Sequence, residues 1–314
     1  IRHSERTAMI DVYRSSVQTW ECDQMGHLNV QFYCEKSIEG LDALAQAIGL
    51  GPAHARQHDT DFVPIDHHLR FHRELRPGTP MTMRAGVLDV REHSLRVVQV
   101  LHNMADNSIA ATMILDAAFV SRASLKPHVI PGPAREAAES LKVEMPEAAA
   151  PRGITMGVPR QNPTLEDAET LGMFTTFQGI VKRHECDAYG RLQVRHYMGR
   201  VSDAIPALLA QTREPGIVGD VRGGNLGGAA LEYRMVHRKA AEDGDVLCLK
   251  TGLRHVGNKT YSWCHWLFDV DSGEAVMTAE AVAITFDLHA RKAIDIPPER
   301  RTRLESLLIP GLSV

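Results

Sequence analysis

A short polar stretch of the chain, ECDQMGHLNVQFY from Glu21 to Tyr33, gathers residue types that can handle a proton. Just before a helical pattern it places an acid, a turn glycine, an imidazole and an amide: Asp23, Gly26, His27 and Asn29. A carboxylate beside a helix N-terminus can attack a carbonyl or activate water, because the free N–H groups there polarise the carbonyl oxygen. An Asp in this place can equally be a plain helix cap, so the stretch alone leaves both roles open.

The chain contains this stretch a second time, as ECDAYGRLQVRHY from Glu185 to Tyr197. Seven of the thirteen positions are identical, and the same offset of 164 residues separates Asp23 from Asp187 and Tyr33 from Tyr197. A repeat of this spacing indicates a tandem duplication in which each copy is a domain-sized unit.

Composition narrows the class of protein. A chain of 314 residues has room for two domains, and 44% apolar residues with a net charge of −4 describe a globular protein without a basic face for nucleic acid. We find no apolar run long enough to cross a bilayer and no signal peptide, so no membrane partner is expected. The five cysteines are odd in number and form no CxxC pair, which favours a reduced, cytoplasmic setting.

The pattern around each motif predicts one helix followed by a meander of strands. In the first half a strand at 12–20 leads into the motif, and apolar residues of the helix then recur at Ile38, Leu41, Ala45 and Ile48. Alternating segments predict strands at 67–75, 81–91, 94–104 and 109–121, and in the second half at 173–184, 230–239, 245–256, 259–270 and 275–287. Short turns imply antiparallel pairing, and an amphipathic helix beside such a sheet must pack on it. The predicted class is α+β, with one wetter sheet face, a polar loop at 52–66 and a kink or break at Pro206.

Prolines and alanines separate the two halves. We expect a first repeat at 1–125, a Pro/Ala-rich connector at 126–165 with a short helix near 134–142, a second repeat at 166–296 and a C-terminal tail helix at 297–314.

The order of strand, D-x-x-G-H-x-N-x-x-x-Y motif, helix with Glu39 six residues after Tyr33, and meander resembles the hotdog-fold thioesterases. The resemblance is to the 4-hydroxybenzoyl-CoA thioesterase-like branch, which includes acyl-carrier-protein thioesterases, in a tandem, double hotdog form. It implies two sheets joined edge to edge around two central helices, with two related sites that mix residues from both halves.

The resemblance also implies an activity, hydrolysis of an acyl-CoA thioester with Asp23 as general base or nucleophile. The catalytic residues it indicates are Asp23, His27, Asn29 and Glu39, and the substrate-binding residues are Gly26, Tyr33, Ser94, Asn258 and Thr260. The chemistry suits such a set, because a thiol of pKa about 8.5 leaves as thiolate without a strong general acid. One carboxylate, water and an oxyanion site then suffice, so no cofactor and no metal are expected.

The second copy is expected to hold a degenerate site, formed by Asp187, Arg191 and Gln193. Arg191 lies four residues after Asp187, where an ion pair would make the carboxylate a poorer base and fill space that a thioester must enter.

Other interpretations stay open from the sequence. The substrate could be an acyl-carrier protein, or the chain could be a non-catalytic acyl-CoA binding module. The acyl group depends on the loops at 52–66 and 214–229, which spacing does not determine. The tandem chain is also expected to pair further into a homo-oligomer.

Overall fold

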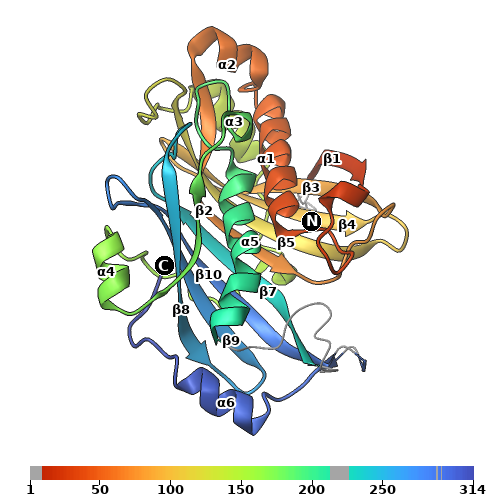
Figure 1. Cartoon of the computed structure of the whole chain (residues 1–314). Helices are drawn as coiled ribbons and strands as arrows, with labels where there is room; N and C mark the ends of the chain where they lie inside the picture. Colours follow the sequence, from red (N-terminus) through yellow and green to blue (C-terminus); the bar gives the residue numbers. More distant parts are fainter. Residues whose placement is uncertain (1–8, 213–225, 288, 291) are drawn as a thin grey trace. The chain divides into compact units, whose positions relative to one another are not determined.

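The computed structural model describes residues 9–212, 226–287, 289–290 and 292–314. The chain divides into two compact units, Ile1–Ala150 and Pro151–Val314, coloured red to yellow-green and green to blue in Figure 1. Each unit has its own set of strands and its own long helix.

The first unit contains β1 (Ile10–Ser16), the 3-10 turn η1 (Thr19–Glu21), α1 (Val30–Ala47), α2 (Pro52–His58), β2 (Thr60–Phe71), β3 (Pro80–Val90), β4 (Ser94–Asn103), β5 (Ser108–Ser121), α3 (Gly132–Ser140) and the 3-10 turn η2 (Glu147–Ala149). The second unit contains α4 (Leu165–Thr170), β6 (Phe174–Ile180), the 3-10 turn η3 (Arg183–Glu185), α5 (Val194–Thr212), β7 (Leu226–His237), β8 (Val246–Val256), β9 (Thr260–Asp269), β10 (Ala275–Asp287), β11 (Lys292–Ala293) and α6 (Pro298–Glu305).

The strands of the two units follow the same order. In the first unit the antiparallel order is β1-β3-β4-β5-β2, and in the second it is β6-β8-β9-β10-β7, with β11 on β10. Each unit therefore combines one long helix with an antiparallel meander. The predicted α+β class, with two repeats of helix on sheet, is confirmed.

Local chemistry sets the ends of α1. The Asn29 side chain caps its start by accepting the Gln31 N–H at 3.0 Å. At the other end the Leu50 N–H turns back to the Ala45 carbonyl at 2.8 Å, and Gly49 has a φ of +85°. Glycine adopts this left-handed conformation without a steric cost, so the helix stops there.

The buried face of α1 packs against its own sheet with glycine at the closest point. A Cβ on Gly40 would lie 2.8 Å from Met83 Sδ and 3.0 Å from Gln99 Nε2. The opposite face of this sheet is also covered, because Val98 and Ile114 pack with Ala149 of the connector. The expectation of one wetter face is therefore wrong for the centre of the sheet.

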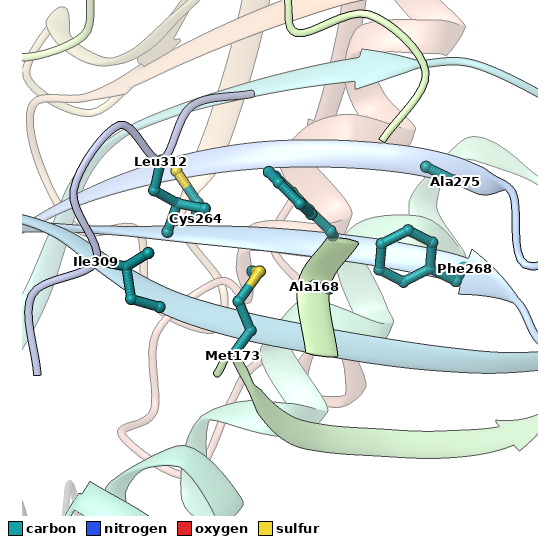
Figure 2. Packing of buried hydrophobic residues seen from close by; sticks show 8 residues of the cluster. Ala168, Met173, Cys264, Phe268, Ala275, Ile309 and Leu312 are labelled. Atoms are coloured by element: carbon teal, nitrogen blue, oxygen red, sulfur yellow. The ribbon is translucent and has the colours of Figure 1, made fainter. Parts of the chain in front are cut away.

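The second unit is covered on both faces as well. Leu208 of α5 packs with Leu253, Trp263 and Leu304 on one face. Figure 2 shows the cluster on the other face, where strand residues meet α4 and the chain end; its members are Ala168, Met173, Cys264, Trp266, Phe268, Ala275, Ile309 and Leu312. The C-terminal segment thus completes the core of its own unit.

Three local predictions from the sequence either differ from the structure or concern residues that it does not describe. The loop expected at 52–66 contains α2 and the first half of β2. The α5 helix continues through Pro206 without a break, and a kink at this residue stays a prediction. Most of the loop at 214–229 lies outside the described residues. No helix in the described part of the chain is long and apolar enough to cross a membrane.

Candidate active site

The loop that carries Asp23 is a small closed hairpin. Cys22 and Leu28 form an isolated antiparallel bridge, and the Asp23 N–H donates to the His27 carbonyl at 2.9 Å. Gly26 turns the chain with a φ of +74°, and its N–H donates to the Asp23 carbonyl at 2.9 Å. The substrate-binding residue predicted at Gly26 is therefore placed at a turn that favours glycine.

Backbone N–H groups orient the Asp23 carboxylate. Its Oδ1 accepts the Met25 N–H at 2.9 Å and the His27 N–H at 3.3 Å. Two backbone donors on Oδ1 hold the carboxylate in one orientation within the loop. The loop leads directly into α1, whose N-cap is Asn29.

The second copy reproduces this loop almost bond for bond. Asp187 Oδ1 accepts the Tyr189 and Arg191 N–H groups at 2.8 and 3.0 Å, and Gly190 has a φ of +80°. The difference lies at the other oxygen, where Arg191 Nε is 3.4 Å from Asp187 Oδ2. The ion pair expected between these two side chains is present.

The His27 ring contacts residues outside the Asp23 loop. Its Nε2 lies 3.1 Å from Glu74 Oε2 and 3.4 Å from Arg76 Nη2. A hydrogen bond to the Glu74 carboxylate needs a proton on His27 Nε2, whereas a hydrogen bond from the Arg76 guanidinium needs a lone pair on the same nitrogen. Only one of these two hydrogen bonds can therefore form at a time. The contact between His27 and Asp23 runs through the His27 backbone N–H instead.

The amide positions differ between the copies. The Asn29 Oδ1 caps α1, whereas Gln193 turns back and its Nε2 donates to the Cys186 carbonyl at 3.0 Å. Asn29 thus holds the helix start beside Asp23, and any contact of its amide with a water or substrate stays a prediction.

Tyr33 lies in the core of the first unit. It is 4% exposed, packs edge-on against Phe71, and bonds through its hydroxyl to the backbone of Leu75. Burial, with the nearby Glu74 carboxylate, raises the pKa of the Tyr33 hydroxyl far above its usual range. Tyr197 repeats the arrangement and accepts the Ala241 N–H at 2.9 Å. The structure therefore gives Tyr33 a packing role in the first unit.

The remaining predicted residues lie apart from the loop. Glu39 is on an exposed part of α1, and in the described residues it makes no hydrogen bond or ion pair with the loop of Asp23. Ser94 and Thr260 begin the equivalent strands β4 and β9. Arg301 of α6 donates to the carbonyls of Gly257 and Asn258 at 2.8 and 3.3 Å, so α6 holds the β8–β9 turn.

A family model described as the thioesterase-like superfamily matches residues 17–151 and 181–304, which is most of the chain and both motif copies. The chain belongs to the thioesterase-like superfamily. This membership places it among thioester hydrolases, and the two matched segments correspond to the two repeats of a double hotdog. No curated protein matches the chain.

Solved structures share the fold of this thioesterase-like chain at low identity. A 12:0-ACP thioesterase from Umbellularia californica has a TM-score of 0.67 at 12% identity, with 87% of this chain and 93% of that chain covered. A provisionally assigned oleoyl thioesterase from Lactobacillus plantarum has a TM-score of 0.65 at 12% identity, covering 90% and 98%. An acyl-ACP thioesterase from Bacteroides thetaiotaomicron has a TM-score of 0.62 at 13% identity, covering 86% and 96%.

Sequence reasoning missed one buried pair beneath each motif loop of the thioesterase-like chain. Lys36 Nζ lies 2.5 Å from Glu21 Oε1, and Arg200 binds both carboxylate oxygens of Glu185 at 2.9 and 2.6 Å. Burial opposes the charged form of Glu185, but the Arg200 hydrogen bonds outweigh it and lower the pKa of Glu185 to about 2. The signal was present, since both copies keep an acid and a base at the same two positions.

The histidines of α2 do not assemble a metal site. His54 and His58 stack with ring centroids 4.3 Å apart, and His54 Nδ1 lies 3.3 Å from Thr60 Oγ1. Across the described ranges, no group of three or more His, Cys, Asp or Glu side chains is arranged to hold a metal ion.

Proposed function

We propose that this chain is an acyl-CoA thioesterase and that Asp23 is its reacting carboxylate. The observation that supports this choice is the contrast between the two loops. Asp23 and Asp187 are oriented by equivalent backbone donors, but within the described residues a guanidinium pairs with the second oxygen of Asp187 and not with that of Asp23. The arginine side chain beside Asp187 Oδ2 occupies space that a water or a thioester would have to enter to reach that carboxylate.

The proposed reaction has two forms. As a base, Asp23 takes a proton from water while the water oxygen adds to the thioester carbon, and the thiolate then leaves. As a nucleophile, Asp23 attacks the carbon itself, expels the thiolate and forms an anhydride that water hydrolyses. In both forms negative charge develops on the carbonyl oxygen, and preorganised N–H donors stabilise such charge.

The Val30 N–H is our candidate for that donor. Val30 is the first residue of α1, and its N–H has no acceptor among the described residues, whereas the Gln31 and Phe32 N–H groups bond to Asn29. The first N–H groups of a helix lack intrahelical partners and carry its positive partial charge. His27, Asn29 and Glu39 remain proposed members of the catalytic set, and Gly26, Tyr33, Ser94, Asn258 and Thr260 of the substrate site.

The deciding experiment is a thiol-release assay with short, long, aromatic and charged acyl-CoAs. Wild-type protein should release thiol from at least one of them, and Asp23→Asn should abolish most of the release. Single turnover in ¹⁸O-labelled water separates the two forms, because label enters Asp23 only if the carboxylate is the nucleophile. Binding of acyl-CoA without any release would instead indicate a non-catalytic binding module.

An acyl-carrier protein is the alternative carrier. Two proteins that share the fold are named acyl-ACP thioesterases, which favours testing acyl-ACP alongside acyl-CoA. A kcat/KM at least tenfold higher for acyl-ACP would assign the carrier protein.

We also propose a cytoplasmic location and assembly of the tandem chain into a homo-oligomer. All five cysteines are free thiols, which suits a reducing compartment. Light scattering of the purified chain tests the assembly, and a monomer mass at micromolar concentration would contradict it.

A further inference from the structure

A buried ion pair lies at the base of the Asp23 loop. Glu21 is 8% exposed and Lys36 is 2% exposed, and their charged atoms are 2.5 Å apart. The second carboxylate oxygen of Glu21 accepts the Gln18 N–H at 2.8 Å. The Lys36 ammonium also lies 5.8 Å from the centre of the Tyr13 ring. One carboxylate thus connects η1 with the second turn of α1.

Glu21 also closes the loop through its backbone. Its carbonyl accepts the Asn29 N–H at 2.8 Å, so the residues that enter and leave the loop are joined at Glu21. Asp23 lies two residues beyond this junction, and α1 begins immediately after Asn29. A displacement of Glu21 would therefore shift the carboxylate relative to the first N–H groups of the helix.

The second repeat keeps this junction. Glu185 accepts the Lys182 N–H at 2.9 Å with its carboxylate and the Gln193 N–H at 3.0 Å with its carbonyl. Arg200 replaces the lysine and lies 5.3 Å from the centre of the Phe177 ring. The acid, the cation and the ring occupy matching positions in both repeats, although the residues around Asp23 and Asp187 have diverged.

We propose that Lys36 is a positioning residue for the thioesterase reaction, acting on Asp23 through Glu21. The proposal rests on the proposed function of Asp23. Removing the ammonium leaves the Glu21 carboxylate without its strongest partner in a buried place, so η1 and the start of the loop can relax toward solvent. A misplacement of about 1 Å at a reacting group can cost a rate factor of about a hundred.

The test compares Lys36→Met with two matched variants. Lys36→Arg introduces the cation that the second repeat uses, and Arg200→Met breaks the corresponding pair beneath the other loop. Glu21→Gln/Lys36→Met removes both charges and so avoids a buried unpaired carboxylate if the single variant folds poorly. The readouts are kcat and KM for thiol release, together with hydrogen exchange of the amides in 22–29 and 186–193.

For Lys36→Met we expect kcat to fall about tenfold or more while KM stays within about threefold, because the acid is displaced and the substrate site is not. Exchange in 22–29 should rise about tenfold, whereas the strands of the first unit keep their protection. For Lys36→Arg, kcat and the exchange rate in 22–29 should both stay within about threefold of wild type. Arg200→Met should loosen 186–193 and leave kcat within about threefold.

Unchanged exchange in 22–29 for Lys36→Met and for the double variant would overturn the proposal. An equal loss of kcat in Arg200→Met would also overturn the proposal, because the loss would then not depend on the pair that holds the Asp23 loop. If wild type released thiol from no substrate, the proposed function would fail, and the exchange data alone would still decide whether Lys36 holds the loop.

Discussion

At the scale of single residues, the two repeats present the same acid in different electrostatic surroundings. In the Asp23 loop, the His27 ring lies within hydrogen-bond distance of both Glu74 and Arg76. Asp187 has a fixed neighbour in Arg191, whose guanidinium also lies 4.8 Å from the centre of the Tyr189 ring. We infer that the second acid has kept its place in the loop and lost its freedom to react.

Asparagine at each position should separate these roles. The amide oxygen of Asn can still accept the two loop N–H groups, so Asp23→Asn should fold normally and lose a factor of about a hundred or more in kcat. Asp187→Asn loses a partly exposed ion pair, which costs about 1 kcal/mol at most, and should keep turnover within a few-fold. Thiol release and denaturant unfolding measure both effects. Equal losses of turnover in the two variants would contradict the asymmetry.

The turn glycines allow a second matched comparison. Gly26 and Gly190 have φ values of +74° and +80°, and a Cβ added at either would meet nothing within 4 Å. Alanine there costs only backbone strain, about 1 kcal/mol in each loop. We expect Gly26→Ala and Gly190→Ala to lower the unfolding free energy by similar amounts, while only Gly26→Ala slows thiol release. A tenfold slower release in Gly190→Ala would show that the second loop takes part in turnover.

The sequence predicted the turn ahead of α1 but missed most of the side-chain partners, and the role of Asp23 stays a prediction. The motif spacing was sufficient to place Asp23 at a helix start, because those residues are neighbours in the chain. The partners of His27 are residues 74 and 76, and no local sequence pattern near His27 predicts these contacts. The pair of Glu21 and Lys36 was detectable only by comparing the two repeats position by position.

At the scale of elements, the alternation of apolar and polar residues predicted most strands well, and it failed where a proline interrupted the pattern. β10 has the bounds that were predicted, whereas β2 begins at Thr60, inside the segment expected to be a loop. The reason is a bulge between Pro64 and Asp66, which leaves Ile65 without a partner on β5. Proline is tolerated at bulges because the missing N–H is not needed there.

The pair of Glu185 and Arg200 should make the start of α5 sensitive to acid. The folded pKa of Glu185 is about 2 against an ordinary 4.5, so its stabilisation is present above about pH 4.5 and is lost as the pH falls toward 2. Arg200→Met should lower the unfolding free energy by about 3 kcal/mol at pH 7. The difference from wild type should shrink steadily below pH 4.5. Urea unfolding between pH 2 and 7 measures it, and a difference that is constant with pH would contradict the assignment.

At the scale of the whole molecule, the connector is held by equivalent residues of the two units. Within the first unit Arg70 donates to the carbonyls of Ala148 and Ala150 at 2.9 and 2.7 Å. Within the second unit Arg234, its repeat mate, donates to the Thr155 carbonyl at 3.2 Å. The segment predicted as a proline-rich link is therefore packed on the sheet of each unit in turn.

Glu232 also anchors this segment in the second unit. Its carboxylate is 2% exposed and accepts the Arg152 N–H at 3.0 Å and the Gly153 N–H at 2.6 Å. A Cβ on Gly153 would lie 3.1 Å from Val282 Cγ1, so the backbone lies close against the sheet at this point. A protease needs an extended, locally unfolded substrate, and this anchoring opposes that opening.

Trypsin should therefore cut slowly after Arg152 in the wild-type chain, although the residue itself is exposed. Glu232→Gln keeps one acceptor oxygen and replaces the other with a donor, so one of the two bonds to the connector is lost. The loss of about 1–2 kcal/mol should raise the cleavage rate roughly tenfold. Glu144→Gln, which makes the same charge change at an exposed position of the connector, should leave the rate unchanged. Mass spectrometry of the fragments over time measures the rate at this one bond. If wild type and Glu232→Gln were cut equally fast, the connector would be a free linker at this point and the anchoring role of Glu232 would be wrong.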